Sequence, residues 1–229
     1  MRKVIITDPP RAALEDVDAL ARFGVATVHE ALGRTGLVGP AIRPIQDGVR
    51  IAGTAVTVLS WPGDNLMIHA AIEQCHQGDI LVVATTSESS DGMFGELFAT
   101  SLQYRGVRGL VISAGVRDIA ELREMNFPAW SRVVNAQGTV KATGGAVNVR
   151  IQMGSALVGP GDVVIADDDG VVIVPRADVA TAITASAARE KKEQVNREAF
   201  RRGELGIDVY GLRKTLADLG VAYEPAPPD

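Results

Sequence analysis

The chain has 229 residues, of which 46% are hydrophobic and 22% charged, enough for one large or two small packed domains. Its net charge of −5 and aromatic content of 4% argue against a nucleic-acid-binding surface. No apolar run approaches the roughly 20 residues of a membrane span, and the first apolar stretch is too short for a signal peptide. The lone Cys75 excludes an internal disulfide, so we expect a cytoplasmic protein.

The first third of the chain predicts short helices followed by alternating strands and helices. A helix is expected over Arg11 to Phe23, after Pro9-Pro10, and should be stopped by Gly24. Thr27 and Glu30 have the spacing of a capping box, which would open a second helix at Thr27. The next elements are a strand over 51–59, a turn over 62–65, a helix over 66–75 and a strand over 80–84.

The central stretch predicts a helix, a buried strand and a second helix. Glu96 to Tyr104 has apolar residues at helical spacing, and Arg105-Gly106 should close that helix, since glycine readily adopts the left-handed conformation. Leu110-Val111-Ile112 is a short β-branched run typical of a buried strand. A helix over 119–125, a strand over 127–134 and an extended segment over 139–152 follow.

The last third predicts a β-hairpin and then helices. Apolar strands at 163–166 and 171–174 flank an acidic turn that ends in Asp169-Gly170. A long polar-faced helix is expected over 177–202, a shorter one over 207–219, and a frayed tail beyond them. With no composition break, we expect a single α/β domain over 1–229 with a mixed sheet.

Arg117 and Asp118 are the first candidates for chemistry. They stand behind Gly115, just after the buried strand, and ligands of open α/β sheets bind beyond the carboxyl ends of strands. Arg117 could clamp a carboxylate through two hydrogen bonds, and Asp118 is a hard oxygen ligand suited to magnesium or manganese. The alternative is a surface ion pair at the start of the next helix.

The loop from Gly92 to Glu96 offers an anion site. If a helix opens at Glu96, the N–H groups of its first turn lack partners within the helix. They point outward with the positive end of the helix dipole, which suits a small carboxylate. We therefore predict that a carboxylate binds between this helix start and Arg117.

Other potential sites are less convincing. His29, His69 and His76 have no paired metal-ligand spacing, and the three aspartates at 167–169 fit a hairpin turn better than a metal site. Cys75 has no activating neighbour in sequence and is expected to be a buried apolar residue. No lysine is singled out for Schiff-base chemistry.

Two sequence blocks resemble a known protein family. Gly-Glu-Leu-x-Ala-Thr-Ser at 95–101 is followed by Arg-Gly-Val-Arg-Gly-Leu-Val-Ile-x-Ala-Gly-Val-Arg-Asp at 105–118. They resemble class II pyruvate aldolases of aromatic degradation, in the superfamily of the ribonuclease E activity regulator. The blocks at 24–36, 62–69, 136–141, 161–170 and 203–208 are also similar to that family, and they favour its 4-carboxy-4-hydroxy-2-oxoadipate branch.

The resemblance implies a fold and an assembly. The family fold is a layered β/β/α sandwich that resembles swivelling phosphohistidine domains, and it assembles as a homotrimer or homohexamer. Glu30, and with less support Glu193, match glutamates that approach the site from a neighbouring subunit. Self-association is therefore an expectation for this chain.

The resemblance also implies roles for site residues. The backbone of Gly95, Glu96, Leu97 and Phe98, together with Arg117, would bind substrate, and Asp118 would ligate Mg²⁺ or Mn²⁺. Glu96 stands where the family more often has Asp, twenty residues before Arg117-Asp118. Ser113 is a second departure, at a position where the family has Asp.

The expected activity is metal-dependent retro-aldol cleavage of 4-carboxy-4-hydroxy-2-oxoadipate to oxaloacetate and pyruvate. Cleavage of 4-hydroxy-4-methyl-2-oxoglutarate to two pyruvates and oxaloacetate decarboxylation should accompany it. Arg117, Asp118, Glu96 and Glu30 are the expected catalytic residues. One alternative is a dedicated oxaloacetate decarboxylase or an aldolase for the methyl substrate. The other is a ribonuclease-regulator-like binding protein without catalysis.

Overall fold

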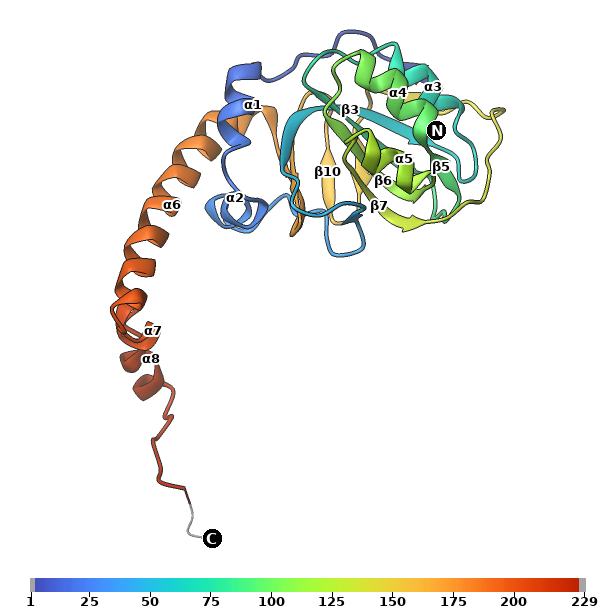
Figure 1. Cartoon of the computed structure of the whole chain (residues 1–229). Helices are drawn as coiled ribbons and strands as arrows, with labels where there is room; N and C mark the ends of the chain where they lie inside the picture. Colours follow the sequence, from blue (N-terminus) through green and yellow to red (C-terminus); the bar gives the residue numbers. More distant parts are fainter. Residues whose placement is uncertain (1–2, 227–229) are drawn as a thin grey trace. The chain divides into compact units, whose positions relative to one another are not determined.

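The computed structural model describes residues 3–226 (Figure 1). The longer strands are β3 (Ile51–Ser60), β4 (Asp79–Thr85), β6 (Gly109–Val116), β7 (Ala129–Val134), β11 (Val163–Asp167) and β12 (Gly170–Val174). The short strands are β1 (Val4–Ile5), β2 (Arg43–Pro44), β5 (Gly92–Phe94), β8 (Ala146–Val147), β9 (Ile151–Met153) and β10 (Ala156–Val158). The helices are α1 (Leu14–Leu20), α2 (Val25–Ala31), α3 (Leu66–Ile72), α4 (Glu96–Tyr104), α5 (Ile119–Glu124), α6 (Val179–Arg201), α7 (Gly206–Val209) and α8 (Leu212–Asp218). A 3-10 turn, η1 (Arg176–Asp178), precedes α6.

A mixed sheet forms the centre of the fold. β3, β4, β6 and β7 pair in parallel in that order, and β5 adds to the end of β6. β11 runs antiparallel to the first half of β3, whereas β8 runs antiparallel to its end. The central strands are apolar and buried on both faces, as covered parallel strands require. The predicted mixed α/β fold is confirmed.

Apolar side chains form a layer on each face of this sheet. On one face, α3, α4 and α5 cover β4 and β6, with Phe94, Phe98 and Leu102 in the packing (Figure 1). On the other face, Trp130 and Met153 pack among side chains of β9, β10, β11 and β12. A third cluster joins α1, α2 and the start of α6 to the β11–β12 hairpin. The carboxyl ends of β5 and β6 meet the start of α4 beside the first layer.

Several helix boundaries predicted from the sequence are wrong. α1 spans only Leu14–Leu20 and α3 only Leu66–Ile72, so both are shorter than predicted. The second helix begins at Val25, so Thr27 lies inside α2 and forms no capping box. The side chain that accepts a hydrogen bond from the Val25 N–H is Asp167, at 2.9 Å, a residue remote in sequence. The single helix expected over 207–219 is divided into α7 and α8, because Gly211 between them has a left-handed φ of +66°.

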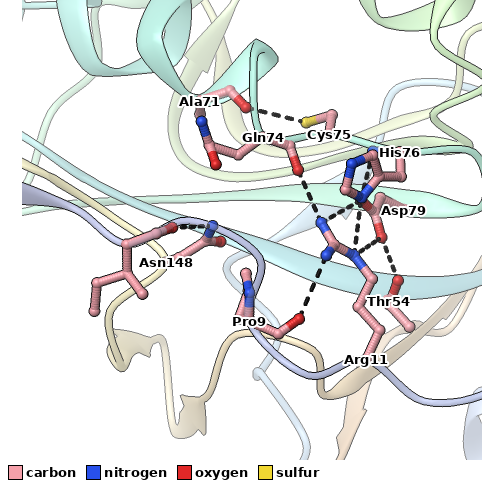
Figure 2. A network of polar contacts seen from close by, with 10 residues as sticks. Pro9, Arg11, Thr54, Ala71, Gln74, Cys75, His76, Asp79 and Asn148 are labelled. Carbon is pink, nitrogen blue, oxygen red and sulfur yellow. Dashed lines mark hydrogen bonds and ion pairs between the residues drawn. The ribbon is translucent and has the colours of Figure 1, made fainter.

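A buried polar network ties the amino-terminal segment to the sheet (Figure 2). Asp79, fully buried at the start of β4, accepts hydrogen bonds from the Arg11 guanidinium at 3.1 Å and from the backbone N–H of His76 at 2.8 Å. The Thr54 hydroxyl of β3 donates to the same carboxylate. Arg11 also donates to the carbonyl of Gln74 at 2.8 Å. One buried charge therefore joins three segments that are distant in sequence.

Contacts divide the chain into two compact units, one ending at Ser186 and the other beginning at Ala187, within α6. The first unit holds the sheet and its layers. The second holds the rest of α6, α7 and α8, with Phe200 and Tyr210 in an edge-on ring contact. One domain over 1–229 stays a prediction. Of the expected frayed tail, 224–226 form no regular element and 227–229 lie outside the described residues. Within 3–226, no helix has both the length and the apolar character needed to cross a membrane.

Candidate functional site

A small cleft of about 180 Å³ opens where α3, the start of α4 and the end of β6 meet. Twelve residues line the cleft: Asn65, His69, Ile72, Gly92, Met93, Gly95, Leu97, Phe98, Ser101, Arg117, Asp118 and Lys141. Of the residues predicted from the sequence, the structure therefore brings Gly95, Leu97, Phe98, Arg117 and Asp118 together in one place.

Arg117 and Asp118 stand at the carboxyl end of β6, and their backbone fixes the direction in which they point. The Arg117 N–H donates to the carbonyl of Phe94 at 2.9 Å, which locks the end of β6 to β5. Asp118 has a left-handed φ of +57°, a conformation that Asp tolerates better than most residues. Its Oδ2 lies 3.7 Å from Arg117 Nε, and both side chains stay partly exposed. Both charged groups are thus available to a ligand.

Gly95 is required at the start of α4 because the site residues approach it closely. Its φ of −157° is ordinary extended backbone, so conformational freedom is not the reason for glycine. A Cβ at this position would collide with Asp118 Oδ2 and would lie 3.1 Å from Arg117 Cγ. The absent side chain therefore lets the carboxylate of Asp118 reach the first turn of α4.

The first turn of α4 presents only part of the predicted anion site. The Glu96 N–H donates to Asp118 Oδ2 at 3.1 Å, and the Phe98 N–H donates to the carbonyl of Gly95 at 3.2 Å. The Leu97 N–H lies between these two at the open end of the helix. The Leu97 side chain is 79% exposed at the edge of the cleft. A ligand carboxylate would therefore meet one amide and the Arg117 guanidinium.

Three residues with predicted or suspected roles lie outside the cleft lining. Glu96 accepts a hydrogen bond from the Thr100 hydroxyl at 2.6 Å, within α4. Ser113 instead joins neighbouring strands, since its hydroxyl oxygen accepts from the Thr85 N–H at 3.1 Å. Glu30, on α2, forms an ion pair with Arg34 at 3.0 Å.

Glu193 belongs to the second compact unit of the chain. It forms an ion pair with Arg189 at 2.8 Å along α6. The expected contribution of Glu30 and Glu193 to a neighbouring subunit's site stays a prediction.

Asn65, His69 and Lys141 also line the cleft, although the sequence did not single them out as site residues. Asn65 and His69 belong to the block at 62–69, and Lys141 ends the block at 136–141. Both blocks contributed to the family resemblance, and this was the available signal. Neither has the regular spacing of a catalytic motif, so their approach to Arg117 could not be read from the sequence.

Asp64 holds both blocks in place. Its carboxylate is almost fully buried and accepts hydrogen bonds from the N–H groups of Leu66 at 2.9 Å, Ala142 at 2.9 Å and Thr143 at 2.6 Å. Burial opposes ionisation of Asp64, but these amides outweigh it and lower the pKa of the carboxyl below its ordinary value. The charged Asp64 thus fixes the start of α3 and the segment that carries Lys141.

His69 is held against the aromatic wall of the cleft. Its ring centroid lies 4.4 Å from that of Phe98. Partial burial lowers the pKa of His69, and the nearby Lys141 ammonium lowers it further. The imidazole is therefore neutral at pH 7, and the side-chain charges of the cleft come from Arg117, Lys141 and Asp118.

The donor set fits a hard divalent cation bound largely by water. Among residues 3–226, no group of three or more His, Cys, Asp and Glu side chains is gathered as a metal cluster. Of the described residues that line the cleft, Asp118 alone provides a carboxylate, and its Oδ2 is the oxygen used by Glu96 and Arg117. Magnesium accepts such a site, because it usually keeps several waters and takes one or two protein carboxylates.

Two further predictions about individual residues are consistent with the structure. Asp167 and Gly170 pair at the end of the β11–β12 hairpin, and Asp168 accepts a hydrogen bond from the Gly48 N–H at 3.0 Å. Cys75 is buried, as expected. Burial, reinforced by the carboxylate of Asp79, raises the pKa of its thiol to about 12, so this thiol is not an activated nucleophile.

Comparison with known proteins shows which family the chain belongs to. Residues 25–173 match the sequence model of the RraA-like family, described as Aldolase/RraA. A protein of Burkholderia multivorans, named "Putative 4-hydroxy-4-methyl-2-oxoglutarate aldolase", is 31% identical over 156 residues, covering 67% of this chain and 94% of its own. A protein of the same name from Halalkalibacterium halodurans is 25% identical over 199 residues, covering 85% of this chain and 94% of its own.

Solved structures agree with that assignment. RraAS2 of Streptomyces coelicolor, described as an unusual member of the RNase ES inhibitor RraA protein family, superposes with a TM-score of 0.74 at 26% identity. The alignment covers 83% of this chain and 99% of that one. An uncharacterized protein of Pseudomonas syringae pv. tomato gives a TM-score of 0.75 at 25% identity, over 88% of this chain and all of the other. The sequence match over residues 25–173 and the shared fold together show that this chain belongs to the RraA-like family.

Proposed function

We propose that this chain is a divalent-metal-dependent aldolase that cleaves 4-hydroxy-2-oxo acids with a tertiary alcohol at C4. The expected substrate is 4-carboxy-4-hydroxy-2-oxoadipate, with 4-hydroxy-4-methyl-2-oxoglutarate as a second substrate. The observation that carries the proposal is the meeting of Arg117, Asp118 and the start of α4 in one cleft. The curated relatives named as aldolases support the same reaction class.

Three groups in the cleft have a defined task in this reaction. Arg117 binds the carboxylate next to the 2-oxo group, and the Leu97 N–H adds a donor at the same end. Asp118 would hold Mg²⁺ or Mn²⁺, which when bound supplies Lewis-acid stabilisation of the 2-oxo oxygen. The guanidinium and the amide are fixed before substrate arrives, so little reorganisation is needed as negative charge develops.

The bond changes balance without an additional reactant. The C4 hydroxyl loses its proton to a base, C4 becomes a carbonyl, and the C3–C4 bond breaks. The electron pair of that bond forms the enolate of pyruvate, whose C3 is then protonated. Oxaloacetate is the other product from the carboxylated substrate, and a second pyruvate is the product from the methyl substrate. Decarboxylation of oxaloacetate passes through the same enolate and is expected as a side activity.

The assay follows pyruvate release from both aldol substrates and from oxaloacetate, with Mg²⁺ and then with EDTA, corrected for spontaneous decarboxylation. We expect metal-dependent turnover that EDTA abolishes. Asp118→Ala should abolish turnover, and Arg117→Ala should lower it roughly 100-fold or more, by analogy with the loss of an oxyanion donor. The matched control is Arg132→Ala, because Arg132 is also partly exposed but pairs with Glu88 outside the cleft. Near-normal turnover of either site variant would contradict the assignment.

A second candidate function is regulation of a ribonuclease by docking, without catalysis. The likeness to RraAS2, described as belonging to a family of RNase ES inhibitors, favours it. This function requires neither the metal nor the Arg117–Asp118 pair. The absence of turnover above the metal-only background, in pure and oligomeric protein, would favour the regulator over the aldolase.

A further inference from the structure

The Arg117 guanidinium is held by packing and not by hydrogen bonds. Its Nε lies 3.7 Å from Asp118 Oδ2, and among residues 3–226 its two Nη atoms donate to no protein acceptor. The side chain is 45% exposed. An arginine side chain of this kind has many rotamers, and only some of them direct the Nη atoms at a ligand. The direction of the guanidinium therefore depends on what packs along the side chain.

Backbone without side chains packs along Arg117 from its Cβ to its guanidinium. A Cβ added at Gly92 would lie 3.3 Å from Arg117 Cβ, and one added at Gly95 would lie 3.1 Å from Cγ. A Cβ added at Gly138 would lie 4.0 Å from Nη1. Gly92 begins β5 and Gly95 precedes α4, whereas Gly138 follows β7. Gly138 is thus the one of these three glycines that lies beside the charged end of Arg117.

The segment 135–138, which ends in this glycine, is tied to the sheet by backbone hydrogen bonds. The Asn135 N–H donates to the carbonyl of Val116 at 3.0 Å, which extends the pairing of β7 with β6 by one residue. The carbonyl of Gln137 accepts from the Gly92 N–H at 2.9 Å. The segment is therefore anchored both to the end of β6 and to the start of β5.

The side chain of Asn135 closes this segment. Its Oδ1 accepts from the N–H of Gln137, two residues on, at 3.1 Å, which makes an Asx-turn. Its Nδ2 donates to the carbonyl of Ser90 at 2.8 Å, in the loop before β5. The Ser90 carbonyl in turn packs on β6, since a Cβ added at Gly115 would lie 2.7 Å from its oxygen. Asn135 therefore joins the segment beside the guanidinium to the loop that lies on β6.

We propose that Asn135 is a positioning residue for Arg117. It holds the segment 135–138 against the guanidinium and so keeps the Nη atoms directed at a carboxylate in the cleft. Without its two hydrogen bonds the segment would relax from Arg117, and the guanidinium would adopt rotamers that no longer reach the ligand. Asn135 does not line the cleft, so its effect passes through Arg117. This inference rests on the proposed function, in which Arg117 binds the carboxylate next to the 2-oxo group.

The test follows pyruvate binding by calorimetry in the presence of Mg²⁺. Asn135→Ala should weaken pyruvate binding roughly tenfold, the value of one to two hydrogen bonds. The affinity for Mn²⁺, measured by electron paramagnetic resonance without pyruvate, should stay within about twofold, because Asp118 and not Arg117 would hold the metal. Asn135→Asp keeps the acceptor for the Gln137 N–H but loses the donor to Ser90, so its pyruvate affinity should fall between those of Asn135→Ala and the wild type.

A double-variant cycle decides whether Asn135 acts through Arg117. Arg117→Ala retains the binding that the metal provides, so a further loss would be measurable. In this background Asn135→Ala should change pyruvate affinity by less than about twofold, because the group that it positions is gone. Gln152→Ala is the matched control, since the Gln152 Nε2 also donates to a carbonyl two residues on, that of Gly154 at 2.9 Å, but outside the cleft. It should bind pyruvate as the wild type does.

Three results would overturn the positioning role: wild-type pyruvate affinity in Asn135→Ala, an equal loss of Mn²⁺ affinity, or additive losses in the double variant. Each of them leaves the aldolase proposal in place if the aldol substrates are cleaved. If the cycle shows the coupling but no substrate is cleaved, the positioning role stands and the aldolase proposal fails. Undetectable pyruvate binding by the wild type would overturn both the carboxylate role of Arg117 and the positioning role of Asn135.

Discussion

At the scale of single residues, the close approach of Gly95 to Asp118 makes a sharp prediction. In Gly95→Ala the new Cβ would collide with Asp118 Oδ2 and displace the carboxylate from the start of α4. We expect pyruvate release to fall at least roughly tenfold, because a small misplacement of a catalytic group is costly. Stability should fall by less than about 1 kcal/mol, since φ is ordinary and Asp118 is partly exposed.

The matched control is Gly138→Ala. A Cβ at Gly138 meets only Arg117 Nη1, at 4.0 Å, an ordinary van der Waals distance. This variant should keep turnover and melting temperature close to those of the wild type. Full activity in Gly95→Ala would mean that the position of the Asp118 carboxylate does not matter for turnover.

At the scale of elements, the sequence pattern predicted the helix ends that depend on contacts within a few residues. The helix over Glu96–Tyr104 was predicted with its observed ends, because apolar spacing and Arg105-Gly106 both act within a few residues. The start of α2 was mispredicted because Asp167 accepts from the Val25 N–H across the fold, where Thr27 offered a local alternative. Lys141 was missed for the same reason, since its position depends on Asp64, more than seventy residues earlier.

Asp64 makes a pH-dependent prediction for the element it organises. The pKa of Asp64 lies below its ordinary value of 3.8, so the stabilisation from its ionised form is fully present above pH 3.8. It is lost as the pH falls through the lower pKa of the folded state. Asp64→Asn weakens the hydrogen bonds from three amides and should cost roughly 2 kcal/mol of unfolding free energy at pH 7. The difference from wild type should shrink below about pH 3.8.

Urea unfolding at pH 7 and at pH 3 measures this difference directly. Asp18→Asn is the control, because Asp18 is 55% exposed in an ion pair with Arg108 and should contribute below about 1 kcal/mol. A pH-independent cost of Asp64→Asn would show that the charge of Asp64 does not stabilise the fold.

At the scale of the whole molecule, a few buried polar contacts connect segments that the layers alone would leave separate. Asp79 joins the amino-terminal segment to β3 and β4, Asp64 joins α3 to the segment of Lys141, and Asp167 joins the hairpin to α2. Asp64 and Asp167 accept backbone N–H bonds from residues that are remote in sequence, Thr143 and Val25, and Asp79 accepts from the remote guanidinium of Arg11. The sequence therefore predicted the layers, whereas the connections between them depend on three aspartates whose partners are remote.

The Arg11–Asp79 pair allows a test of whether such a buried contact stabilises the whole fold. Arg11→Met removes the counter-charge of a fully buried carboxylate and should cost about 3–5 kcal/mol of unfolding free energy. Asp79→Asn should also destabilise the protein, because Thr54 and His76 would then donate to a neutral amide oxygen. The double variant should lose clearly less than the sum of the two, since each single variant leaves the partner charge unpaired, whereas the double variant removes both charges.

Urea unfolding of the two single variants and the double variant gives the coupling energy, with Arg22→Met as the exposed control. A cost below about 1 kcal/mol for Arg11→Met would show that water replaces the guanidinium at Asp79. Additive losses would show that Arg11 and Asp79 stabilise the fold separately, through their other hydrogen bonds. If the double variant instead loses less than the sum, the amino-terminal segment and the central sheet unfold as one cooperative unit. The cleft at the far end of β4 and β6 is built on that unit.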